Sequence, residues 1–412
     1  MSTFNINLHE VCYSLSDAFD LVGVTHIHHG KRVAYMAAEC GKHLGWDGDH
    51  LDSLFQAGIL HDCGVSKTVV HSRLAQLEWE NEKDHCEIGA DLLLSSSILS
   101  KLSDIVRHHH THWSVLKDLD LPLDVKLSAN CIYMVDRVDV LTLAAMKDQS
   151  NILLGREETQ HKIFDRKGTW FCPELVDAFL DVSRSEAFWF RLENQFVNGY
   201  AATWISHDVY RDVEFRELRE LVHIFSVVVD AKSPFTCEHS EGVANLSRLL
   251  GELFHLTRKT CEMLELAGLL HDIGKLRVPD ELLDKTDKLT SDEFLSIQRH
   301  SFDTFDILKN IQGMQEIALW AGQHHERVDG SGYPYRSGHE GISLEARIIA
   351  VADIFQALAQ KRPYRGPLPP DEIIKILNEQ VADGQLDQRV VTCVENNLQV
   401  CWKAATEVLK LT

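Results

Sequence analysis

The chain contains two copies of one residue pattern, and this internal repeat is the strongest constraint on its fold. Residues 57–64 read AGILHDCG and residues 267–274 read AGLLHDIG, an offset of 210 (271 − 61). His29 and His239 are separated by the same offset (239 − 29). Because each copy has the length of a whole domain, the sequence predicts two domains of one fold in tandem.

Histidine and aspartate are the residues that relate the two copies most clearly. The offset is 215 between His85 and His300 (300 − 85) and 217 between Asp136 and Asp353 (353 − 136). The first copy contains His29, His61, Asp62, His85, His109, His110 and Asp136, and the second contains His239, His271, Asp272, His300, His324, His325 and Asp353. Five imidazoles and two carboxylates are enough ligands for two divalent metal ions, and a carboxylate can bridge the pair.

Apolar residues recur at helical spacing along most of the chain. A helix that begins near Phe215 would carry Leu218, Leu221, Val222 and Phe225 on one face, either as a connecting helix or as the first helix of the second domain. The helical pattern weakens between residues 194 and 212, and few segments read as convincing strands. We therefore predict an all-α protein with two tandem helical domains, residues 1–198 and 199–412.

The charge and cysteine content exclude several classes of function. A formal net charge of −21 argues against binding to nucleic-acid polymers or to an anionic membrane surface. No segment approaches the roughly 18 apolar residues that span a bilayer. The ten cysteines include no CxxC pair, and residues 1–8 lack the pattern of a signal peptide. We expect a cytoplasmic protein with reduced thiols, in which local charges and metal ions hold any small anionic ligand.

The segment from His324 to Pro334, which reads HHERVDGSGYP, combines metal-ligand residues with a turn whose glycines let the backbone approach a ligand. The second copy also contains DAKSPFT at 230–236, HDIGK at 271–275, VP at 278–279 and RPYR at 362–365. With these motifs, residues 215–400 resemble the HD-GYP branch of the HD phosphohydrolase superfamily. The resemblance implies a bacterial signalling enzyme that hydrolyses a cyclic dinucleotide at a buried metal centre.

The resemblance also implies a role for individual residues. One metal ion would be held by His239, His271, Asp272 and Asp353, and a second by Asp272, His300, His324 and His325. Asp272 and Lys275 would serve catalysis, with Lys275 at the phosphate; an ordinary surface lysine is the alternative. The implied substrate-binding residues are Lys275, Arg327, Asp329, Gly330, Gly332, Tyr333 and Pro334. Iron or manganese suits these ligands best, and nickel, cobalt and zinc also fit them.

The first copy keeps all seven ligand types but not the loop chemistry. Residues 111–114 replace the segment 326–329 of the second copy, and no Gly-Tyr-Pro follows. We expect an accessory or regulatory HD domain with its own metal site, formed by His29, His61, Asp62, His85, His109, His110 and Asp136. This domain would contact the second domain within the chain, and we also consider a homodimer. A second activity, a vestigial site and a solvated histidine patch at 108–112 are the alternatives.

The second copy departs from the family pattern at four positions. Gly242 replaces a common arginine, which the first copy retains as Arg32. Thr304 replaces a glycine and Gln356 replaces an aspartate. Members with a third metal ion have a glutamate four residues before the first histidine, and here that residue is Phe235. Because phenylalanine cannot coordinate, we expect two metal ions.

The tandem layout, with a first copy that lacks the Gly-Tyr-Pro motif, resembles phosphodiesterases that act on 3',3'-cyclic GMP-AMP (cGAMP). We therefore expect hydrolysis of 3',3'-cGAMP, cyclic di-GMP or both to a linear dinucleotide, through two-metal activation of a water. The alternative is a catalytically silent cyclic-dinucleotide receptor that signals through the interface between the two domains. The retained ligands favour the enzyme. An HD enzyme for a free nucleotide or an alarmone would leave residues 330–334 unexplained.

Overall fold

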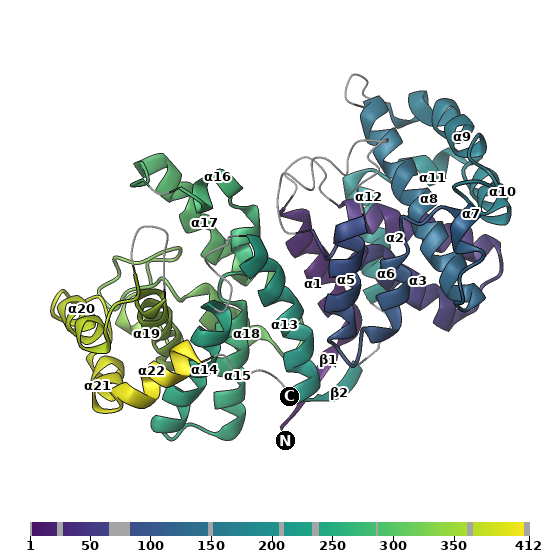
Figure 1. The fold of residues 1–412 in the computed structure, drawn as a ribbon. Coiled ribbons are helices and arrows are strands. Elements are labelled where there is room, and N and C mark those ends of the chain that lie inside the picture. Colours follow the sequence, from purple (N-terminus) through teal and green to yellow (C-terminus); the bar gives the residue numbers. More distant parts are fainter. Residues whose placement is uncertain are drawn as a thin grey trace. The chain divides into compact units, whose positions relative to one another are not determined.

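The computed structural model describes residues 2–22, 28–65, 83–146, 151–205, 210–232, 239–285, 287–360 and 366–407. Within these ranges the chain consists of helices, loops and one small sheet (Figure 1), which confirms the predicted all-α class. The chain divides into two compact units, Asn7–Tyr210 and Met1–Ile6 together with Arg211–Thr412. None of the described helices combines the length and the apolar character that a membrane crossing requires.

A two-stranded sheet joins the first residues of the chain to the second unit. Strand β1 (Thr3–Asn7) pairs with strand β2 (Tyr210–Glu214). The buried Phe4 ring packs against Phe215, with the ring centroids 6.4 Å apart. Helical periodicity does not reveal these strands, because their pairing depends on residues at opposite ends of the first copy.

The division between the units lies at Tyr210 and Arg211, downstream of the predicted boundary at 198/199. Helix α12 (Asn194–Ile205) continues through the predicted boundary and belongs to the first unit. Helix α13 (Phe215–Lys232) lies in the second unit and packs against the helix α15 (Arg258–Leu270). Its four predicted apolar residues are all buried, so α13 is part of the core of the second unit.

The N-terminal unit is formed by short helices around α2 and α8. Its helices are α1 (Leu8–Asp20), α2 (His29–His43), α3 (Gly48–Leu60), α5 (Lys83–Leu94), η1 (Ser100–Leu102), α6 (Ser103–Arg107), α7 (Trp113–Leu116), α8 (Leu123–Met146), η2 (Ile152–Gly155), α9 (Arg156–Phe164), α10 (Pro173–Val182), α11 (Glu186–Phe190) and α12. Helix α2 packs against α3, α8, α10 and α12, which places its first residue, His29, in the interior of the unit.

The C-terminal unit has a corresponding arrangement around α14 and α19. Besides α13 and α15, its described helices are α14 (His239–Leu253), η3 (Ile273–Arg277), α16 (Asp280–Leu283), α17 (Ser291–Leu308), α18 (Gln315–Gly322), η4 (His339–Gly341), α19 (Leu344–Ala359), α20 (Pro370–Ala382), α21 (Gln388–Asn396) and α22 (Leu398–Thr406).

A capping box starts α17. The Thr290 side chain accepts from the Glu293 backbone N–H at 3.3 Å, and the Glu293 side chain accepts from the Thr290 backbone N–H at 2.7 Å.

The same close helix contact occurs in both units. A Cβ atom on Gly58 in α3 would lie 2.9 Å from the Cα of Ala34 in α2. A Cβ atom on Gly268 in α15 would lie 2.6 Å from the Cα of Ala244 in α14. Both pairs are related by the offset of 210 (268 − 58 and 244 − 34). Each helix pair therefore requires glycine at the crossing. The His-Asp turn begins directly after the second helix of each pair, α3 or α15.

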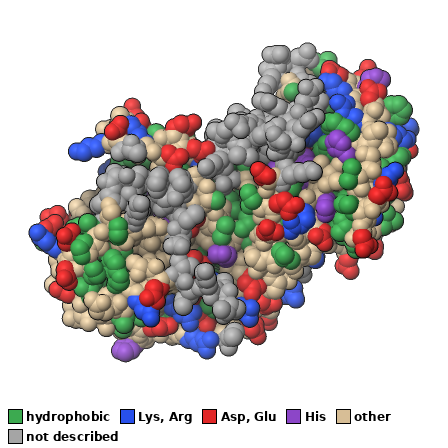
Figure 2. Space-filling view, viewed as in Figure 1, with side chains coloured by type: hydrophobic (Ala, Val, Ile, Leu, Met, Phe, Trp, Pro, Cys, Tyr) green, Lys and Arg blue, Asp and Glu red, His purple; other side chains and the backbone are tan. Residues whose placement is uncertain are grey.

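Charged side chains of both signs share the surface. Acidic and basic groups are interspersed on the face shown in Figure 2. Exposed ion pairs include Lys162 with Glu158 at 2.7 Å and Arg156 with Glu186 at 3.2 Å. Such exposed pairs contribute little to folding, so burial of apolar helix faces provides most of the stability.

Candidate metal centres

The C-terminal unit brings all seven predicted ligands into one buried cluster. His239 begins α14, His271 and Asp272 follow α15, His300 lies in α17, His324 and His325 follow α18, and Asp353 lies in α19. The N-terminal unit repeats this placement with His29 in α2, His61 and Asp62 after α3, His85 in α5, His109 and His110 after α6, and Asp136 in α8. Helices therefore position every one of these side chains.

Backbone carbonyls fix the ring orientation of three histidines in the C-terminal cluster. The Nδ1 atoms of His271, His300 and His324 lie 2.7, 2.6 and 2.6 Å from the carbonyl oxygen three residues earlier. A carbonyl only accepts, so each Nδ1 carries the proton and each Nε2 keeps a lone pair. In the neutral form of each ring, Nε2 is therefore the atom that can bind a metal ion.

One group of ligand atoms gathers around His239, His271 and Asp353. His239 Nε2 lies 3.3 Å from His271 Nε2 and 3.3 Å from Asp353 Oδ1. Asp272 Oδ2 is 3.3 Å from His271 Nε2. His239 Nδ1 donates to Gln356 Oε1 at 2.5 Å, which leaves the His239 Nε2 lone pair directed into the group. Lone pairs and a carboxylate that converge in this way repel each other unless a cation lies between them.

A second group is formed by His300, His324 and His325. His300 Nε2 lies 3.2 Å from His324 Nε2, and the rings of His324 and His325 have centroids 4.0 Å apart. Asp272 Oδ1 is 3.5 Å from His300 Nε2 and 3.8 Å from His324 Nε2. This oxygen is buried and has no hydrogen-bond partner. Asp272 thus presents one oxygen to each group, which is the geometry of a bridging carboxylate, and its unpartnered Oδ1 fits a metal ligand.

The buried environment shifts the pKa values of these groups in different directions. Burial lowers the pKa of His300 to about 4 and that of His324 to about 3. Burial lowers the pKa of His271 as well, but the charges of Asp272 and Asp353 outweigh it and raise this pKa to about 8. Burial alone would raise the pKa of Asp272, but His271 and Lys275 hold it well below its usual range. His300 and His324 are therefore neutral and face an ionised Asp272 near neutral pH, whereas His271 has to release a proton to bind a metal ion.

The loop after His325 is built on a buried glutamate and on glycine. Glu326 Oε1 accepts from the Tyr335 backbone N–H at 2.7 Å and Oε2 accepts from the Ser337 backbone N–H at 2.8 Å. A Cβ atom on Gly332 would lie 2.4 Å from the Arg327 backbone N and 2.5 Å from the Glu326 Cα, so only glycine fits. Gly330 has a φ of +80°, a conformation that also favours glycine. The loop therefore folds back tightly over the second group of histidines.

The predicted substrate-binding residues lie at different distances from the cluster. A cis peptide bond joins Tyr333 to Pro334. The Tyr333 ring packs on the His325 ring, with the centroids 4.8 Å apart. Lys275 Nζ donates to Asp272 Oδ2 at 2.5 Å. The Arg327 side chain has a buried Nη1 without a hydrogen-bond partner. Asp329 is exposed and accepts from the Ser331 backbone N–H at 2.9 Å, so within the structure it shapes the loop.

Two departures from the family pattern, Gly242 and Gln356, lie next to each other in the structure. In the first copy Arg32 Nε donates to Asp139 Oδ1 at 2.5 Å, and Asp139 Oδ2 lies 2.7 Å from His29 Nδ1. The residues at the same offsets in the second copy are Gly242 and Gln356. A Cβ atom on Gly242 would lie 2.8 Å from the Gln356 Cγ. A buried ion pair in one copy is thus replaced by an uncharged pair in the other.

This exchange changes the electrostatics of the first histidine. Burial lowers the pKa of His29, but hydrogen bonds to Asp136 and Asp139 outweigh it and raise the pKa to about 10. In the second copy burial lowers the pKa of His239. From the sequence, Gln356 is visible only as a departure from the family pattern, and neither it nor Asp139 is recognisable as a hydrogen-bond partner of these histidines. The sequence does contain a signal for this contact. Arg32 and Asp139 of the first copy are both replaced in the second copy, by Gly242 and Gln356.

The third departure, Thr304, strengthens the turn that carries the ligands. Its hydroxyl accepts from the Gly274 backbone N–H at 3.0 Å and donates to the His271 carbonyl at 3.0 Å. The residue at this position in the first copy is Gly89. Phe235 and the RPYR segment at 362–365 lie outside the described residues.

The N-terminal unit assembles its seven residues in nearly the same geometry. His29 Nε2 lies 3.3 Å from Asp136 Oδ1, and His61 Nε2 lies 3.4 Å from Asp62 Oδ2. Asp62 Oδ1 faces the other side, 3.6 Å from His85 Nε2. His61 Nε2 is buried and makes no hydrogen bond. The structure therefore brings together a second candidate metal centre, with Asp62 in the position of Asp272.

Among the described residues of the N-terminal unit, none forms a counterpart of the C-terminal loop at this cluster. His112 instead stacks on Trp170 with the centroids 4.5 Å apart and lies 5.9 Å from the Tyr133 ring. The Trp113 backbone N–H donates to the Trp170 carbonyl at 2.8 Å. The segment after the histidine pair is thus packed against its own domain.

Comparisons with known proteins agree with the internal repeat. Residues 27–141 and 223–390 each match a family model described as HD domain, one in each unit. The 3'3'-cGAMP-specific phosphodiesterase 1 of Vibrio cholerae is 36% identical over 400 residues, which cover 96% of this chain and 93% of that protein. The cyclic di-GMP phosphodiesterase response regulator RpfG of Xanthomonas campestris is 38% identical over 171 residues, 41% of this chain and 45% of that protein.

A solved structure shares the fold along the whole chain. The crystal structure of a cyclic GMP-AMP specific phosphodiesterase of V. cholerae, V-cGAP3, matches with a TM-score of 0.66 and 24% identity, over 97% of this chain and 99% of that chain. The matches confirm the resemblance that the sequence motifs indicated. The chain therefore belongs to the family of cyclic-dinucleotide phosphodiesterases with two HD domains in tandem, the second of which is an HD-GYP domain.

Proposed function

We propose that the C-terminal domain hydrolyses 3',3'-cGAMP, and cyclic di-GMP as a second substrate, to a linear dinucleotide at a centre of two divalent metal ions. The observation that carries the proposal is the position of Asp272, whose two oxygens face two separate groups of histidine nitrogens. The preference for 3',3'-cGAMP rests on the relative that matches 96% of this chain, which is named for that nucleotide. The match to RpfG covers only 41% of this chain.

The chemistry requires positive charge, because the anionic oxygens of a phosphodiester repel a nucleophile and the leaving alkoxide is poor. When bound, divalent ions supply a water nucleophile at neutral pH and offset the charge on the phosphoryl oxygens. His239, His271 and Asp353 would hold one ion and His300, His324 and His325 the other, with Asp272 as the shared ligand. Imidazole and carboxylate donors suit iron or manganese, and also nickel, cobalt or zinc.

Two cationic side chains would bind the phosphate. Lys275 Nζ donates to Asp272 Oδ2, and its side chain is 25% exposed, so it can contact both the cluster and a substrate. The buried Nη1 of Arg327 has no hydrogen-bond partner, and a phosphoryl oxygen would provide a charge-assisted one. Tyr333, packed on His325, would form the edge of the substrate site together with Gly330, Gly332 and Pro334.

We assign an accessory role to the N-terminal domain. It holds the ligand types, but its segment after the histidine pair packs against Trp170 and Tyr133 and contains no Gly-Tyr-Pro. A substrate lip like that of the C-terminal domain is therefore missing from the described part of this domain.

The test is chromatographic product analysis of the full chain, loaded with manganese or iron, after incubation with 3',3'-cGAMP, cyclic di-GMP and cyclic di-AMP. We expect linear dinucleotide from 3',3'-cGAMP, a slower reaction with cyclic di-GMP and none with cyclic di-AMP. Asp272→Ala should abolish product formation. Lys275→Ala should slow it by about 10- to 100-fold, the value of a hydrogen bond to a charged group.

The controls separate the parts of the proposal. Each variant is compared with the unaltered chain by thermal unfolding, so that loss of fold is not read as loss of catalysis. Turnover unchanged in Lys275→Ala would remove the phosphate role of this residue. Intact nucleotide in every sample, despite measurable binding, would overturn the enzymatic proposal in favour of a receptor.

A further inference from the structure

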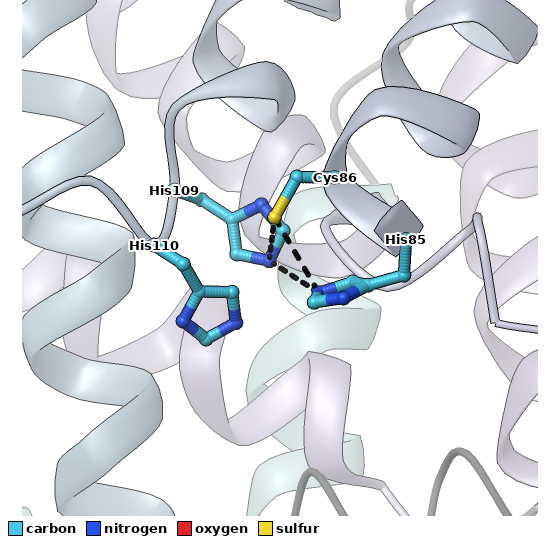
Figure 3. A group of neighbouring side chains, drawn as sticks. All are labelled: His85, Cys86, His109 and His110. Carbon is cyan, nitrogen blue, oxygen red and sulfur yellow. Dashed lines mark hydrogen bonds between the residues drawn. The ribbon is translucent and has the colours of Figure 1, made fainter. Parts of the chain in front are cut away.

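One side chain in the N-terminal cluster has different chemistry from its C-terminal counterpart. Cys86 follows His85 in α5, and its side chain points toward His109, with His110 on the far side of that ring (Figure 3). Cys86 Sγ lies 3.6 Å from His85 Nε2 and 4.0 Å from His109 Nε2. The ligand atoms of Cys86 and the three histidines all lie within 4.8 Å of one another. Sulfur is therefore placed among nitrogen ligands inside the unit.

The distances fit a tetrahedral zinc site. Zinc binds imidazole nitrogen at about 2.0–2.1 Å and thiolate sulfur at about 2.3 Å, which separates two nitrogens by about 3.3 Å and a sulfur from a nitrogen by about 3.6 Å. The two Nε2 atoms of His85 and His109 are 3.3 Å apart, and Cys86 Sγ is 3.6 Å from the nearer one. His109 Nδ1 donates to the Val106 carbonyl at 2.5 Å, so His109 Nε2 keeps its lone pair for an ion.

Burial and the comparison of the two copies support the same assignment. Cys86 is 2%, His85 5% and His109 0% exposed, so the three ligands are shielded from water. The residue at the same offset in the C-terminal cluster is Ser301 (301 − 86 = 215). Its Oγ lies 3.4 Å from His300 Nε2. The two clusters thus differ by a thiol in place of a hydroxyl beside the same histidine, and thiolate is the softer ligand.

We propose that the N-terminal domain holds a zinc ion bound by His85, His109, His110 and the thiolate of Cys86. Asp62 Oδ1, 3.6 Å from His85 Nε2, can add a fifth ligand. A set of four or five protein ligands leaves no open coordination position, which is typical of a structural rather than a catalytic zinc site. The two domains would then differ in metal preference, because only the N-terminal cluster would bind its metal ion through a thiolate.

The alternative is a hydrogen bond from the Cys86 thiol to His85, with no metal ion bound. X-ray absorption at the zinc edge of the full chain, reconstituted with zinc, separates the two. We expect a sulfur shell at about 2.3 Å, because the C-terminal cluster of described residues contains no cysteine. A cobalt-substituted sample should show a sulfur-to-metal charge-transfer band. Neither readout depends on enzyme activity, and the unaltered chain alone gives both.

Variants attribute the signal to one residue. Cys86→Ser reproduces the side chain of the C-terminal cluster, and it should remove the sulfur shell and weaken zinc binding by at least about tenfold. Cys63→Ser is the matched control, since buried Cys63 in the same domain donates to the Gly89 carbonyl instead, at 3.5 Å; both signals should persist in it. A zinc-loaded unaltered chain without a sulfur shell, or a sulfur shell that survives in Cys86→Ser, would overturn the proposal.

Discussion

The carboxylate of Asp272 has two oxygens in different surroundings, and this difference determines what the C-terminal cluster can bind. Oδ2 lies 3.3 Å from His271 Nε2 and accepts from Lys275, whereas the buried Oδ1 faces His300 and His324 without a hydrogen bond. An unpartnered buried carboxylate oxygen is costly, and a divalent ion removes that cost. Metal removal should therefore destabilise the C-terminal domain as well as inactivate it.

The residue pattern predicted the seven members of the cluster because each belongs to a short motif repeated at a fixed offset. It could not predict which atom of each ring faces inward, since that depends on backbone carbonyls such as that of Gly268. Cys86 escaped notice for a related reason. A single cysteine beside a histidine has no motif of its own, and only comparison with Ser301 across the repeat reveals it.

Gly332 provides a prediction for the loop. Gly332→Ala should lower kcat/KM on the order of 100-fold, because its Cβ would displace Arg327 and the Tyr333 edge by about an ångström. Metal content should stay unchanged, since none of the seven candidate ligands lies within the loop after His325. Gly338→Ala is the control, because its Cβ would meet no atom closer than 3.9 Å. Equal kcat/KM values for Gly332→Ala and the unaltered chain would show that the loop does not position the substrate.

At the level of secondary structure, the helices follow from apolar spacing and local capping. The Thr290 and Glu293 pair that starts α17 is a signal readable in sequence. Strands β1 and β2 were not predicted, because five residues of each are too few to show a period and their pairing is non-local. The close crossing of α2 and α3 likewise depends on the partner of Gly58, which the spacing of one helix does not contain.

The crossing leads to a stability prediction. Gly58→Ala should lower the free energy of unfolding of the N-terminal domain by about 1–3 kcal/mol, because the new Cβ meets the Ala34 backbone. Gly199→Ala, in α12 of the same unit, should raise it by about 0.5–1 kcal/mol, since nothing lies within 4 Å and alanine favours a helix. Urea unfolding of both variants measures the difference. A Gly58→Ala chain as stable as Gly199→Ala would mean that α2 and α3 can separate without cost.

For the molecule as a whole, duplication of one HD unit explains both the length of the chain and the two clusters. Unit boundaries were less predictable than unit number, because β1 joins residues 1–6 to the second unit. The copies have since become different at linked positions. The Arg32 and Asp139 ion pair corresponds to Gly242 and Gln356, and Cys86 corresponds to Ser301. These differences support separate roles for the two candidate metal centres.

The most direct test of catalysis in the C-terminal centre measures 3',3'-cGAMP hydrolysis and bound metal in parallel for Asp272→Asn and Asp62→Asn. The two variants make the same near-isosteric change at equivalent positions of the two units. Asp272→Asn should lose hydrolysis and the metal of the C-terminal domain, because an uncharged amide with a single oxygen cannot serve both histidine groups. Asp62→Asn should keep both hydrolysis and the metal of the C-terminal domain. Hydrolysis that survives in Asp272→Asn but disappears in Asp62→Asn would contradict this assignment.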